Sequence, residues 1–365
     1  MRIAIDISQA IFGTGVSTYT KSLVQGLLSL DKNNDYLLFG GSLRRYKELQ
    51  HLAQSFRASN VQSKIFAYPP IFANLVWNKL HTMPIEKLLG SVDVLHTSDW
   101  TEPPSRAFKV TTIHDLAPIL HPNLFPRDTI RDIVQTHKLR LSWVKKESER
   151  IVVPSVATKN DLINLGFTGD IVRVIPEAPA NIFKPSTNYE IEKLKKRYKI
   201  SGKYVLAVGI NVRKNTDRII KAFDLAGAGM DLKLVFVGHS KYSKIEETRN
   251  IRVAGHVSFN ELPVFYSGAE VLVYPSLYEG YGMPILESFA CGTPVVTSDI
   301  SSMPEVAGGA AVLVDPYDIN SIAEGITKAL RGPKRLITDG FERVKQFSWE
   351  ATAKQTLEVY NEGVK

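Results

Sequence analysis

Two glutamates, Glu279 and Glu287, flank a short segment whose residue types could bind a phosphorylated ligand. The segment reads Glu279-Gly-Tyr-Gly-Met-Pro-Ile-Leu-Glu287 and follows a β-branched run at Val271–Tyr274. Glu287 would lie about one turn inside a helix, where a carboxylate can accept hydrogen bonds from ribose hydroxyls. Glu279 would lie on the loop, nearer any group attached beyond the phosphates. Either glutamate alone is more often a solvated charge, so the pair carries the information.

The residues between the two glutamates predict a helix that begins close to the ligand. Gly280 and Gly282 allow a close approach of the backbone, and Pro284 suits the first helical turn, where its missing N–H would be unpaired in any case. The N–H groups around Tyr281 and Met283 would then lie at the positive end of the helix dipole. Phosphate is the ligand that such an end prefers.

Two neighbouring cations follow an earlier strand-like run in the second half of the chain, which also contains the two glutamates. The loop Gly209-Ile-Asn-Val-Arg-Lys-Asn215 comes after Tyr204–Val208 and precedes a helical pattern. Arg213, as a planar fork, and Lys214, as a point charge, could neutralise a diphosphate at this strand exit. Without the companion segment at Glu279, this pair would be read as a solvated helix start.

The first half of the chain offers weaker signals at its strand exits. Gly15 lies in the loop Gly13–Ser17, which lacks the full G-x-G-x-x-G spacing and by itself predicts only a tight turn. His114 and Asp115 end one strand-like run, and His96 ends another. Ligands of parallel sheets bind at such carboxyl ends.

The secondary-structure pattern distributes these residues over two parallel α/β sheets. Short β-branched runs alternate with turn residues and longer amphipathic stretches, which is typical of doubly wound folds. Helices are expected at Ser17–Leu30 and Arg127–Ser148. The expected strands are Ile3–Ile7, Tyr36–Phe39, Val92–Leu95, Val110–Ile113, Ile151–Pro154, Val172–Ile175, Tyr204–Val208, Lys233–Val237, Ile251–Ala254, Val271–Tyr274, Pro294–Thr297 and Ala311–Val314.

The stretch Pro176–Asn188 is rich in Pro and Asn and predicts a linker, with the domain boundary near Pro185. A chain of 365 residues exceeds what one hydrophobic core usually supports, which favours two domains. Residues 1–184 would form the N-terminal domain and residues 185–347 the C-terminal domain. Residues 348–365 have helical spacing, and we expect them to pack back on the N-terminal domain.

Composition excludes several classes of protein. Hydrophobic residues make up 44% and charged residues 22% of the chain, which rules out a largely disordered, collagen-like or coiled-coil protein. The single cysteine, Cys291, excludes an intramolecular disulfide and suits a reducing compartment. No apolar run reaches the roughly 20 residues of a membrane-spanning helix, and Met1 leads into a strand-like run without a signal-peptide profile. We therefore expect a cytoplasmic protein.

The formal charge of +8 is concentrated in the first half, where residues 1–176 carry 21 Lys and Arg against 15 Asp and Glu. No basic cluster is dense enough to indicate a nucleic-acid partner. Together with the aromatic and apolar residues of 66–89, the charge is compatible with peripheral contact with the anionic inner face of a cell membrane.

The spacing of Glu279 and Glu287 around Gly-Tyr-Gly-Met-Pro resembles the E-x7-E signature of family 4 of the retaining GT-B glycosyltransferases, the group 1 glycosyl transferases. The resemblance implies that Glu279 lies by the donor sugar and that Glu287 binds the ribose. The loop at Arg213 and Lys214 resembles the one that supplies the family's diphosphate-binding cations. Many members carry Arg where this chain has Ile210, so the division of labour between the two cations stays open.

Further matches extend the resemblance to nearly the whole chain. Gly15 matches the family's N-terminal glycine loop, whose backbone approaches the donor phosphate. His114 matches the histidine beside the donor sugar, with Asp115 near sugar or acceptor. Val257, in Gly255-His-Val-Ser258, matches the place where the backbone meets the nucleobase, and His96 would only line the acceptor side.

The resemblance implies two Rossmann-like domains that face a cleft, the GT-B architecture, in which residues 1–184 would bind the acceptor and residues 185–347 the nucleotide-sugar donor. It further implies transfer of a hexosyl group, of mannose or glucose type, from a GDP- or UDP-linked sugar to a hydroxyl of a glycan or lipid-linked acceptor, with retention of anomeric configuration. No cofactor is implied beyond this nucleotide-sugar substrate. The chain has no Asp-x-Asp motif, so we expect cations and helix dipoles, rather than a metal, to stabilise the leaving diphosphate.

Three other interpretations stay open. A sugar-nucleotide epimerase on the same scaffold would need positioned acid and base carboxylates and no acceptor. A non-catalytic carbohydrate- or lipid-binding protein could keep the fold, although the intact glutamates and cations argue against it. The incomplete glycine loop disfavours a nicotinamide dehydrogenase. The sequence leaves the donor, the acceptor and the oligomeric state undetermined.

Overall fold

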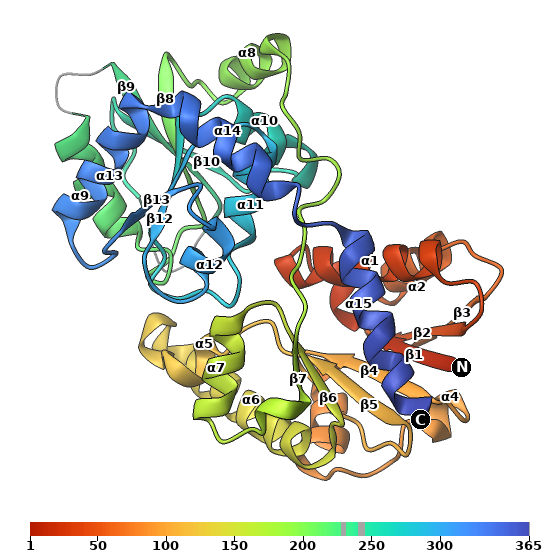
Figure 1. Ribbon diagram of the computed structural model, residues 1–365. Coiled ribbons are helices and arrows are strands. Elements are labelled where there is room, and N and C mark those ends of the chain that lie inside the picture. Colours follow the sequence, from red (N-terminus) through yellow and green to blue (C-terminus); the bar gives the residue numbers. More distant parts are fainter. Residues whose placement is uncertain (228–230, 240–244, 365) are drawn as a thin grey trace. The chain divides into compact units, whose positions relative to one another are not determined.

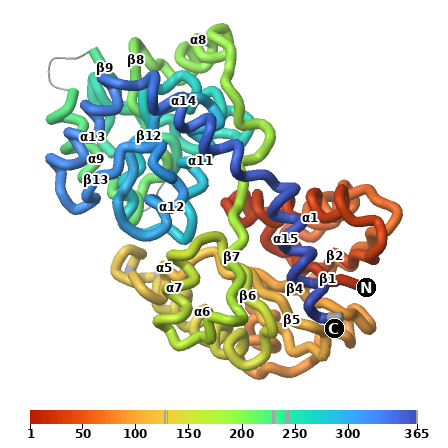
Figure 2. The backbone as a smooth tube through the Cα atoms, viewed as in Figure 1, coloured from red at the N-terminus to blue at the C-terminus, as the bar shows by residue number. Residues whose placement is uncertain are grey.

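The computed structural model describes residues 1–227, 231–239 and 245–364, which form two compact units (Figure 1 and Figure 2). The first unit comprises Met1–Pro122, Arg127–Glu177 and Ser348–Lys365. The second comprises Asn123–Pro126 and Ala178–Phe347. The last segment of the chain therefore belongs to the same unit as the first.

The first unit is built on a sheet of seven parallel strands in the order β3-β2-β1-β4-β5-β6-β7. Both faces of β1 are apolar, because Ile3 and Ile5 enter one core cluster and Ala4 enters another. This is expected where helices cover both faces of a parallel sheet. The strands are β1 (Arg2–Asp6), β2 (Asp35–Gly41), β3 (Val61–Phe66), β4 (Val94–Ser98), β5 (Phe108–Thr112), β6 (Arg150–Val153) and β7 (Val172–Val174).

Helices connect these strands. They are α1 (Gly15–Leu30), α2 (Tyr46–Ser55), α3 (Pro70–Ala73), α4 (Glu86–Leu89), α5 (Ala117–Leu120), α6 (Arg127–Glu147), α7 (Val156–Asn164) and α15 (Trp349–Asn361), with the 3-10 turns η1 (Ser8–Ile11), η3 (Pro122–Leu124), η4 (Gly169–Ile171) and η6 (Glu362–Val364) and the π turn η2 (Asn74–Lys79). The loop before α1 ends in a cap, since the Thr14 side chain accepts a hydrogen bond from the backbone N–H of Ser17.

The C-terminal helix α15 packs beside α1 (Figure 1). A Cβ atom on Gly26 of α1 would lie 2.9 Å from the Cβ of Ala353, so glycine permits this close approach. Tyr360 is fully buried, and its hydroxyl lies 2.5 Å from Nδ1 of His96 on β4. The tail thus completes the core of the first unit.

The second unit is built on six parallel strands in the order β10-β9-β8-β11-β12-β13. Alternate residues of β8 enter core clusters on opposite faces, Tyr204 and Leu206 on one, Val205 and Ala207 on the other. The elements are β8 (Lys203–Val208), β9 (Leu232–Val237), β10 (Ile251–Gly255), β11 (Val271–Tyr274), β12 (Val295–Ser298), β13 (Val312–Val314), α8 (Asn188–Arg197), α9 (Thr216–Ala226), η5 (Phe259–Glu261), α10 (Leu262–Ser267), α11 (Met283–Ala290), α12 (Met303–Ala307), α13 (Ile319–Arg331) and α14 (Pro333–Val344).

Both sheets share one topology. In each, the chain builds outward from a central strand on one side and then continues on the other side, so β1 lies beside β4 and β8 beside β11. Such a pair marks a topological switch point, where the connections leave in opposite directions and open a crevice at the carboxyl ends. The predicted fold class, α/β with two Rossmann-like doubly wound domains, is confirmed.

Two details differ from the expected elements. The first unit ends at Glu177, because the following chain already packs in the second unit, where Phe183 is buried against Tyr266. Strand β3 was not among the expected strands. As an edge strand it exposes Gln62 and Lys64, so it lacks the apolar pattern of the interior strands.

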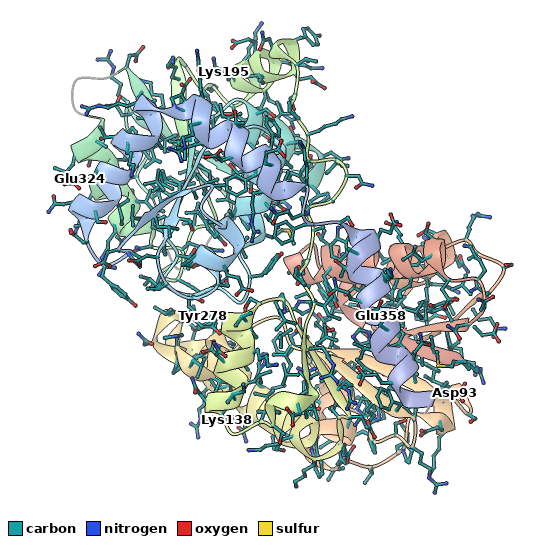
Figure 3. All side chains as sticks on the ribbon, viewed as in Figure 1. Asp93, Lys138, Lys195, Tyr278, Glu324 and Glu358 are labelled. Atoms are coloured by element: carbon teal, nitrogen blue, oxygen red, sulfur yellow. The ribbon has the colours of Figure 1, made fainter. Side chains whose placement is uncertain are left out.

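Charged side chains such as Glu324 of α13 and Glu358 of α15 are exposed on the outer faces of their helices (Figure 3). Within the described ranges, no helix has both the length and the apolar character needed to cross a bilayer.

Candidate active site

Three charged side chains meet at the switch point of the second sheet. The loop after β8 carries Arg213 and Lys214, and the loop after the neighbouring strand β11 carries Glu279. Nη1 of Arg213 lies 2.5 Å from Oε2 of Glu279, and Nζ of Lys214 lies 2.6 Å from its Oε1. One carboxylate therefore holds both cations at the carboxyl end of the sheet.

The cation loop is fixed by its own backbone and by Asn215. This residue has φ +63°, a left-handed conformation that Asn tolerates better than most residues. Its buried amide donates hydrogen bonds to the carbonyl oxygens of Pro275 (3.0 Å) and Pro316 (2.6 Å). The N–H of Leu277 in turn donates to the carbonyl of Arg213 at 2.8 Å. The loops after β8 and β11 are thus tied to each other directly.

The glutamate loop leads into α11 through a glycine that no other residue replaces easily. Gly282 has φ +104° and lies at the N-cap of α11, where no side chain caps the helix in the described part of the chain. The hydroxyl of Ser302 donates to the carbonyl oxygens of Glu279 (2.9 Å) and Tyr281 (2.6 Å). The helix begins at Met283, with Pro284 in its first turn, as the sequence predicted.

Glu287 lies further along α11 and is buried. The hydroxyl of Tyr266 donates to its Oε2 at 2.7 Å. Burial raises the pKa of Glu287 to about 7, although this hydrogen bond and the charge of Lys214 both act to lower it. Since Lys214 acts on both glutamates, the four predicted residues of the second unit form one electrostatic cluster.

The pKa of Glu279 shifts in the opposite direction, although this residue is also buried. Its surroundings also desolvate the carboxylate, which raises the pKa, but the charges of Arg213 and Lys214 outweigh this and hold the pKa at about 2. Glu279 is therefore ionised at neutral pH. The site presents one negative and two positive charges, with a net charge of one positive unit available to an anion.

The first unit holds the other predicted residues. His114 follows β5, with Nδ1 3.1 Å from Oε1 of Glu177 and Nε2 3.3 Å from the hydroxyl of Ser98. Burial alone would lower the pKa of His114, but the carboxylates of Asp99, Glu177 and Asp115 raise it. The imidazole is therefore biased toward its protonated form.

Two expected residues of the first unit have structural roles. His96 was expected to line the acceptor side, but it is buried, with hydrogen bonds to Tyr360 and to Thr112 (2.8 Å), and burial lowers its pKa to about 3. Asp115 accepts a hydrogen bond from the N–H of Ala117 at 3.0 Å and so fixes the turn that begins α5. Gly15 is the first residue of α1, and a Cβ atom there would meet open space.

Comparison with known proteins shows the family of this chain. Residues 190–343 match the glycosyl transferases group 1, and residues 13–178 match glycosyltransferase family 4. The chain belongs to the group 1 glycosyltransferases. This glycosyltransferase is 28% identical to O-antigen chain mannosyltransferase B of Escherichia coli, over 95% of this chain and 96% of that relative.

Solved structures share the GT-B fold of this glycosyltransferase. Sucrose-phosphate synthase from Thermosynechococcus elongatus has a TM-score of 0.73 at 18% identity, covering 99% of this chain and 98% of that chain. Anabaena HepE in complex with UDP-glucose has a TM-score of 0.72 at 15% identity, covering 99% and 100%. At these identities the likeness shows the fold alone.

The second unit of this glycosyltransferase holds the residues predicted for the diphosphate, the ribose and the nucleobase, together with two tyrosines that the sequence did not single out, whereas Gly15 and His114 lie in the first unit. Val257 lies after β10, and its side chain packs in the same core cluster as Tyr281. Tyr274, at the end of β11, contacts Nζ of Lys214 with its hydroxyl, and the Lys214 ammonium lies 4.3 Å from the centre of its ring. Tyr274 and Tyr266 carried no signal in the sequence, because an aromatic residue in an apolar run predicts only core packing.

In the described part of the chain, no group of three or more His, Cys, Asp and Glu side chains is arranged to hold a metal ion.

Proposed function

We propose that this glycosyltransferase moves a hexosyl group, of mannose or glucose type, from a GDP- or UDP-linked sugar to a hydroxyl of a glycan or lipid-linked acceptor. The observation that carries the proposal is the pairing of Arg213 and Lys214 on Glu279 at the switch point of the second sheet. A mannosyltransferase relative matched over nearly the full chain supports the mannose type. HepE, solved with UDP-glucose, supports a nucleotide sugar as donor.

In this proposal, the second unit holds the donor. Arg213 and Lys214 bind the diphosphate, aided by the backbone from Gly280 to Met283 at the start of α11. The carboxyl group of Glu287 accepts hydrogen bonds from the ribose hydroxyls, and the backbone at Val257 meets the nucleobase. Glu279 keeps both cations in place and lies on the side of the transferred sugar.

The proposed chemistry needs little beyond charge stabilisation. The bond between the anomeric carbon and the diphosphate oxygen breaks, and the two cations stabilise the charge that develops on the leaving group without a metal ion. The acceptor hydroxyl attacks from the same face, so the anomeric configuration is retained. Its proton passes to the departing phosphate oxygen. We assign contact with the sugar to His114 and contact with the donor phosphate to the backbone at Gly15.

The test is turnover of GDP-mannose and UDP-glucose in excess EDTA, with anomeric configuration of the product read by NMR. We expect product of retained configuration with one of these donors. Arg213→Ala and Lys214→Ala should each lower kcat/KM by roughly 30- to 1000-fold, the effect of losing one preorganised donor, or about 2–4 kcal/mol. Arg335→Ala and Lys345→Ala, which remove exposed cations elsewhere on the second unit, are the matched controls. Full dependence on a divalent ion, an inverted product, or donor conversion without acceptor would contradict the proposal.

The proposal includes peripheral contact of the first unit with an anionic membrane. Phe72, Leu75 and Leu80 are exposed on or beside the turns α3 and η2, next to the exposed Lys79. Co-sedimentation with phosphatidylglycerol vesicles at low salt tests this contact. Leu75→Ser combined with Leu80→Ser should reduce the bound fraction, and Leu225→Ser, an exposed leucine of the second unit, should not. Equal binding of all variants would refute the contact.

A further inference from the structure

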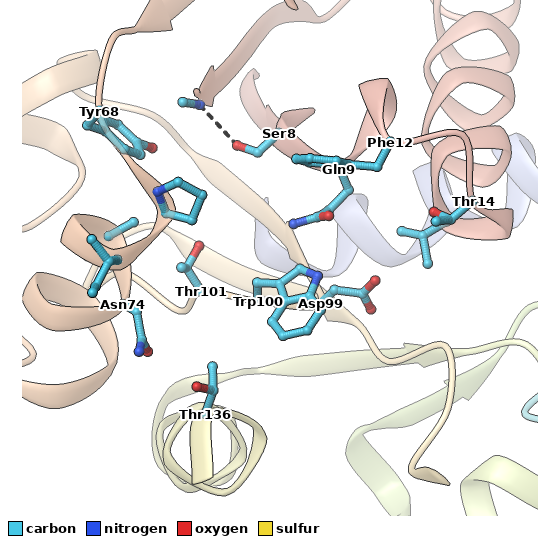
Figure 4. A pocket seen from close by; sticks show the side chains of 15 residues that line it. Ser8, Gln9, Phe12, Thr14, Tyr68, Asn74, Asp99, Trp100, Thr101 and Thr136 are labelled. Atoms are coloured by element: carbon cyan, nitrogen blue, oxygen red, sulfur yellow. Dashed lines mark hydrogen bonds between the residues drawn. The ribbon is translucent and has the colours of Figure 1, made fainter. Parts of the chain in front are cut away.

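A cavity of about 640 Å³ opens at the switch point of the first sheet (Figure 4). Its walls come from the loops that leave β1 and β4, from the segment after β3, and from Thr136 of α6. This is the topological counterpart of the place where the second sheet holds Arg213 and Lys214, since both lie where the strand order reverses. The function proposed above assigns no residue to this cavity.

Three polar side chains that line the cavity form no side-chain hydrogen bond within the described part of the chain. They are the carboxylate of Asp99, which acts on His114 only through its charge, the amide of Gln9 and the hydroxyl of Thr101. Asp99 also has φ +57°, a left-handed conformation that Asp adopts more readily than most residues and that recurs at functional sites. Unpaired polar groups around one cavity indicate a ligand that carries donors and acceptors of its own.

Aromatic rings form much of the remaining wall. Trp100 lies 5.1 Å, centroid to centroid, from the ring of His137, which holds it edge to face. Tyr68 lies over Gly41, where a Cβ atom would be only 2.0 Å from the ring carbon Cζ. Figure 4 shows the amide of Gln9 pointing toward Trp100, with Tyr68 and Asn74 on one side and Thr14 on the other.

The charge of the wall selects against phosphate. No Lys or Arg is among the described residues that line the cavity, and Asp99 contributes a carboxylate. A phosphorylated group would meet repulsion there without a compensating cation. A purely aliphatic chain would cover the rings but leave the carboxylate, the amide and the hydroxyl desolvated and unpaired. A pyranose ring satisfies both parts of the wall, because it has an apolar face of C–H groups and a rim of hydroxyls.

We propose that this cavity binds an uncharged sugar residue of the acceptor, with Asp99 and Gln9 bound to its hydroxyls and Trp100 packed on its apolar face. The inference rests on the proposed transferase function and narrows its acceptor to a glycan whose receiving end carries no phosphate. The position of the cavity agrees with this role. Ser98, which precedes Asp99, contacts His114, the residue assigned to the transferred sugar.

The experiment is saturation-transfer NMR on the full chain without donor, with methyl α-D-mannopyranoside, mannose 6-phosphate and farnesol as probes. We expect transfer to the ring protons of the mannoside, with mannose 6-phosphate at least tenfold weaker. Asp99→Asn, which keeps an αL-tolerant residue of the same shape, should weaken the mannoside about tenfold and relieve the discrimination against mannose 6-phosphate. Trp100→Ala should abolish the transfer. Tyr189→Ala, which removes an exposed aromatic ring of the second unit, is the matched control and should change nothing.

Three outcomes would overturn the inference. Equal binding of mannoside and mannose 6-phosphate, displacement of the mannoside by farnesol, or an unchanged mannoside affinity in Asp99→Asn each contradicts an uncharged sugar in this cavity. Donor turnover separates this failure from a failure of the proposed function. If the wild-type chain transfers sugar while Asp99→Asn keeps the acceptor KM, the transferase proposal stands and the cavity assignment falls. If mannoside binds as expected and no donor is turned over, the transferase proposal falls.

Discussion

The two buried glutamates of the second unit should respond to amide substitution in opposite ways. Glu287 has a folded pKa of about 7 against an ordinary 4.5, so the folded protein binds a proton there that the unfolded chain releases. Stability is then lost as the pH rises from 4.5 through 7. At about 1.4 kcal/mol per pH unit, the loss reaches about 3 kcal/mol above pH 7. Glu287→Gln keeps an acceptor for the Tyr266 hydroxyl but removes this titration.

We therefore expect the stability of Glu287→Gln relative to wild type to rise by about 2 to 3 kcal/mol between pH 5 and pH 8. Glu279→Gln is the matched control, because its carboxylate is equally buried but paired. The folded pKa of Glu279, about 2, lies below 4.5, so its contribution is complete above pH 4.5 and lost only as the pH falls toward 2. Glu279→Gln should be less stable by up to about 3 kcal/mol, with no change from pH 5 to pH 8.

The assay must report on the second unit. All four tryptophans, Trp77, Trp100, Trp143 and Trp349, belong to the first unit, so their fluorescence follows the wrong transition. Hydrogen exchange of the amides in β8 and β11, read by mass spectrometry across the pH series, gives the local opening free energy directly. A pH-independent difference between Glu287→Gln and wild type, or a stabilised Glu279→Gln, would refute the assignment of opposite charge states to these two groups.

Three further outcomes follow from single contacts. In Lys214→Ala the affinity for GDP or UDP, measured by calorimetry, should fall and lose most of its salt dependence, because the lost group is a charge rather than a packing surface. Tyr360→Phe should lower the free energy of unfolding of the first unit by about 1–3 kcal/mol in tryptophan-detected urea melts, since it leaves Nδ1 of His96 without its buried partner; an unchanged midpoint would contradict the role of this bond. Gly41→Ala should displace the Tyr68 ring and weaken mannoside binding in saturation-transfer NMR with little loss of donor affinity, and full mannoside binding would show that the ring is not part of the site.

The residues that we propose for the donor side could be predicted from the sequence because they lie close to the ends of strands. Glu279 and Glu287 lie on one loop and the helix that it opens, and Arg213 and Lys214 are adjacent. The structure places strand β11 beside strand β8, and this pairing, which the alternation of elements alone does not fix, brings their loops together. The spacing of these residues could not show which side chains surround each glutamate, because those contacts form only in the folded protein.

In the first unit, the residues that line the proposed acceptor cavity could not be predicted from the sequence. Asp99, Gln9 and Tyr68 are far apart in sequence and follow three different strands, and none belongs to a motif with recognisable spacing. These residues surround one cavity only because their strands lie side by side in the order of the sheet. His96 illustrates the same point, because a histidine at the end of a strand can belong either to a ligand site or to the core. The packing of α15, which brings the Tyr360 hydroxyl to His96, places this residue in the core.

The amino-acid sequence by itself determined the α/β class, the two sheets and the residues that could hold a diphosphate, because these depend on periodicity and on spacing within one loop or turn. Only the tertiary structure decided which glutamate is charged. That state depends on whether cations or an aromatic hydroxyl surround a desolvated carboxylate, and Arg213 and Lys214 reach Glu279 through the pairing of two strands that the chain makes far apart.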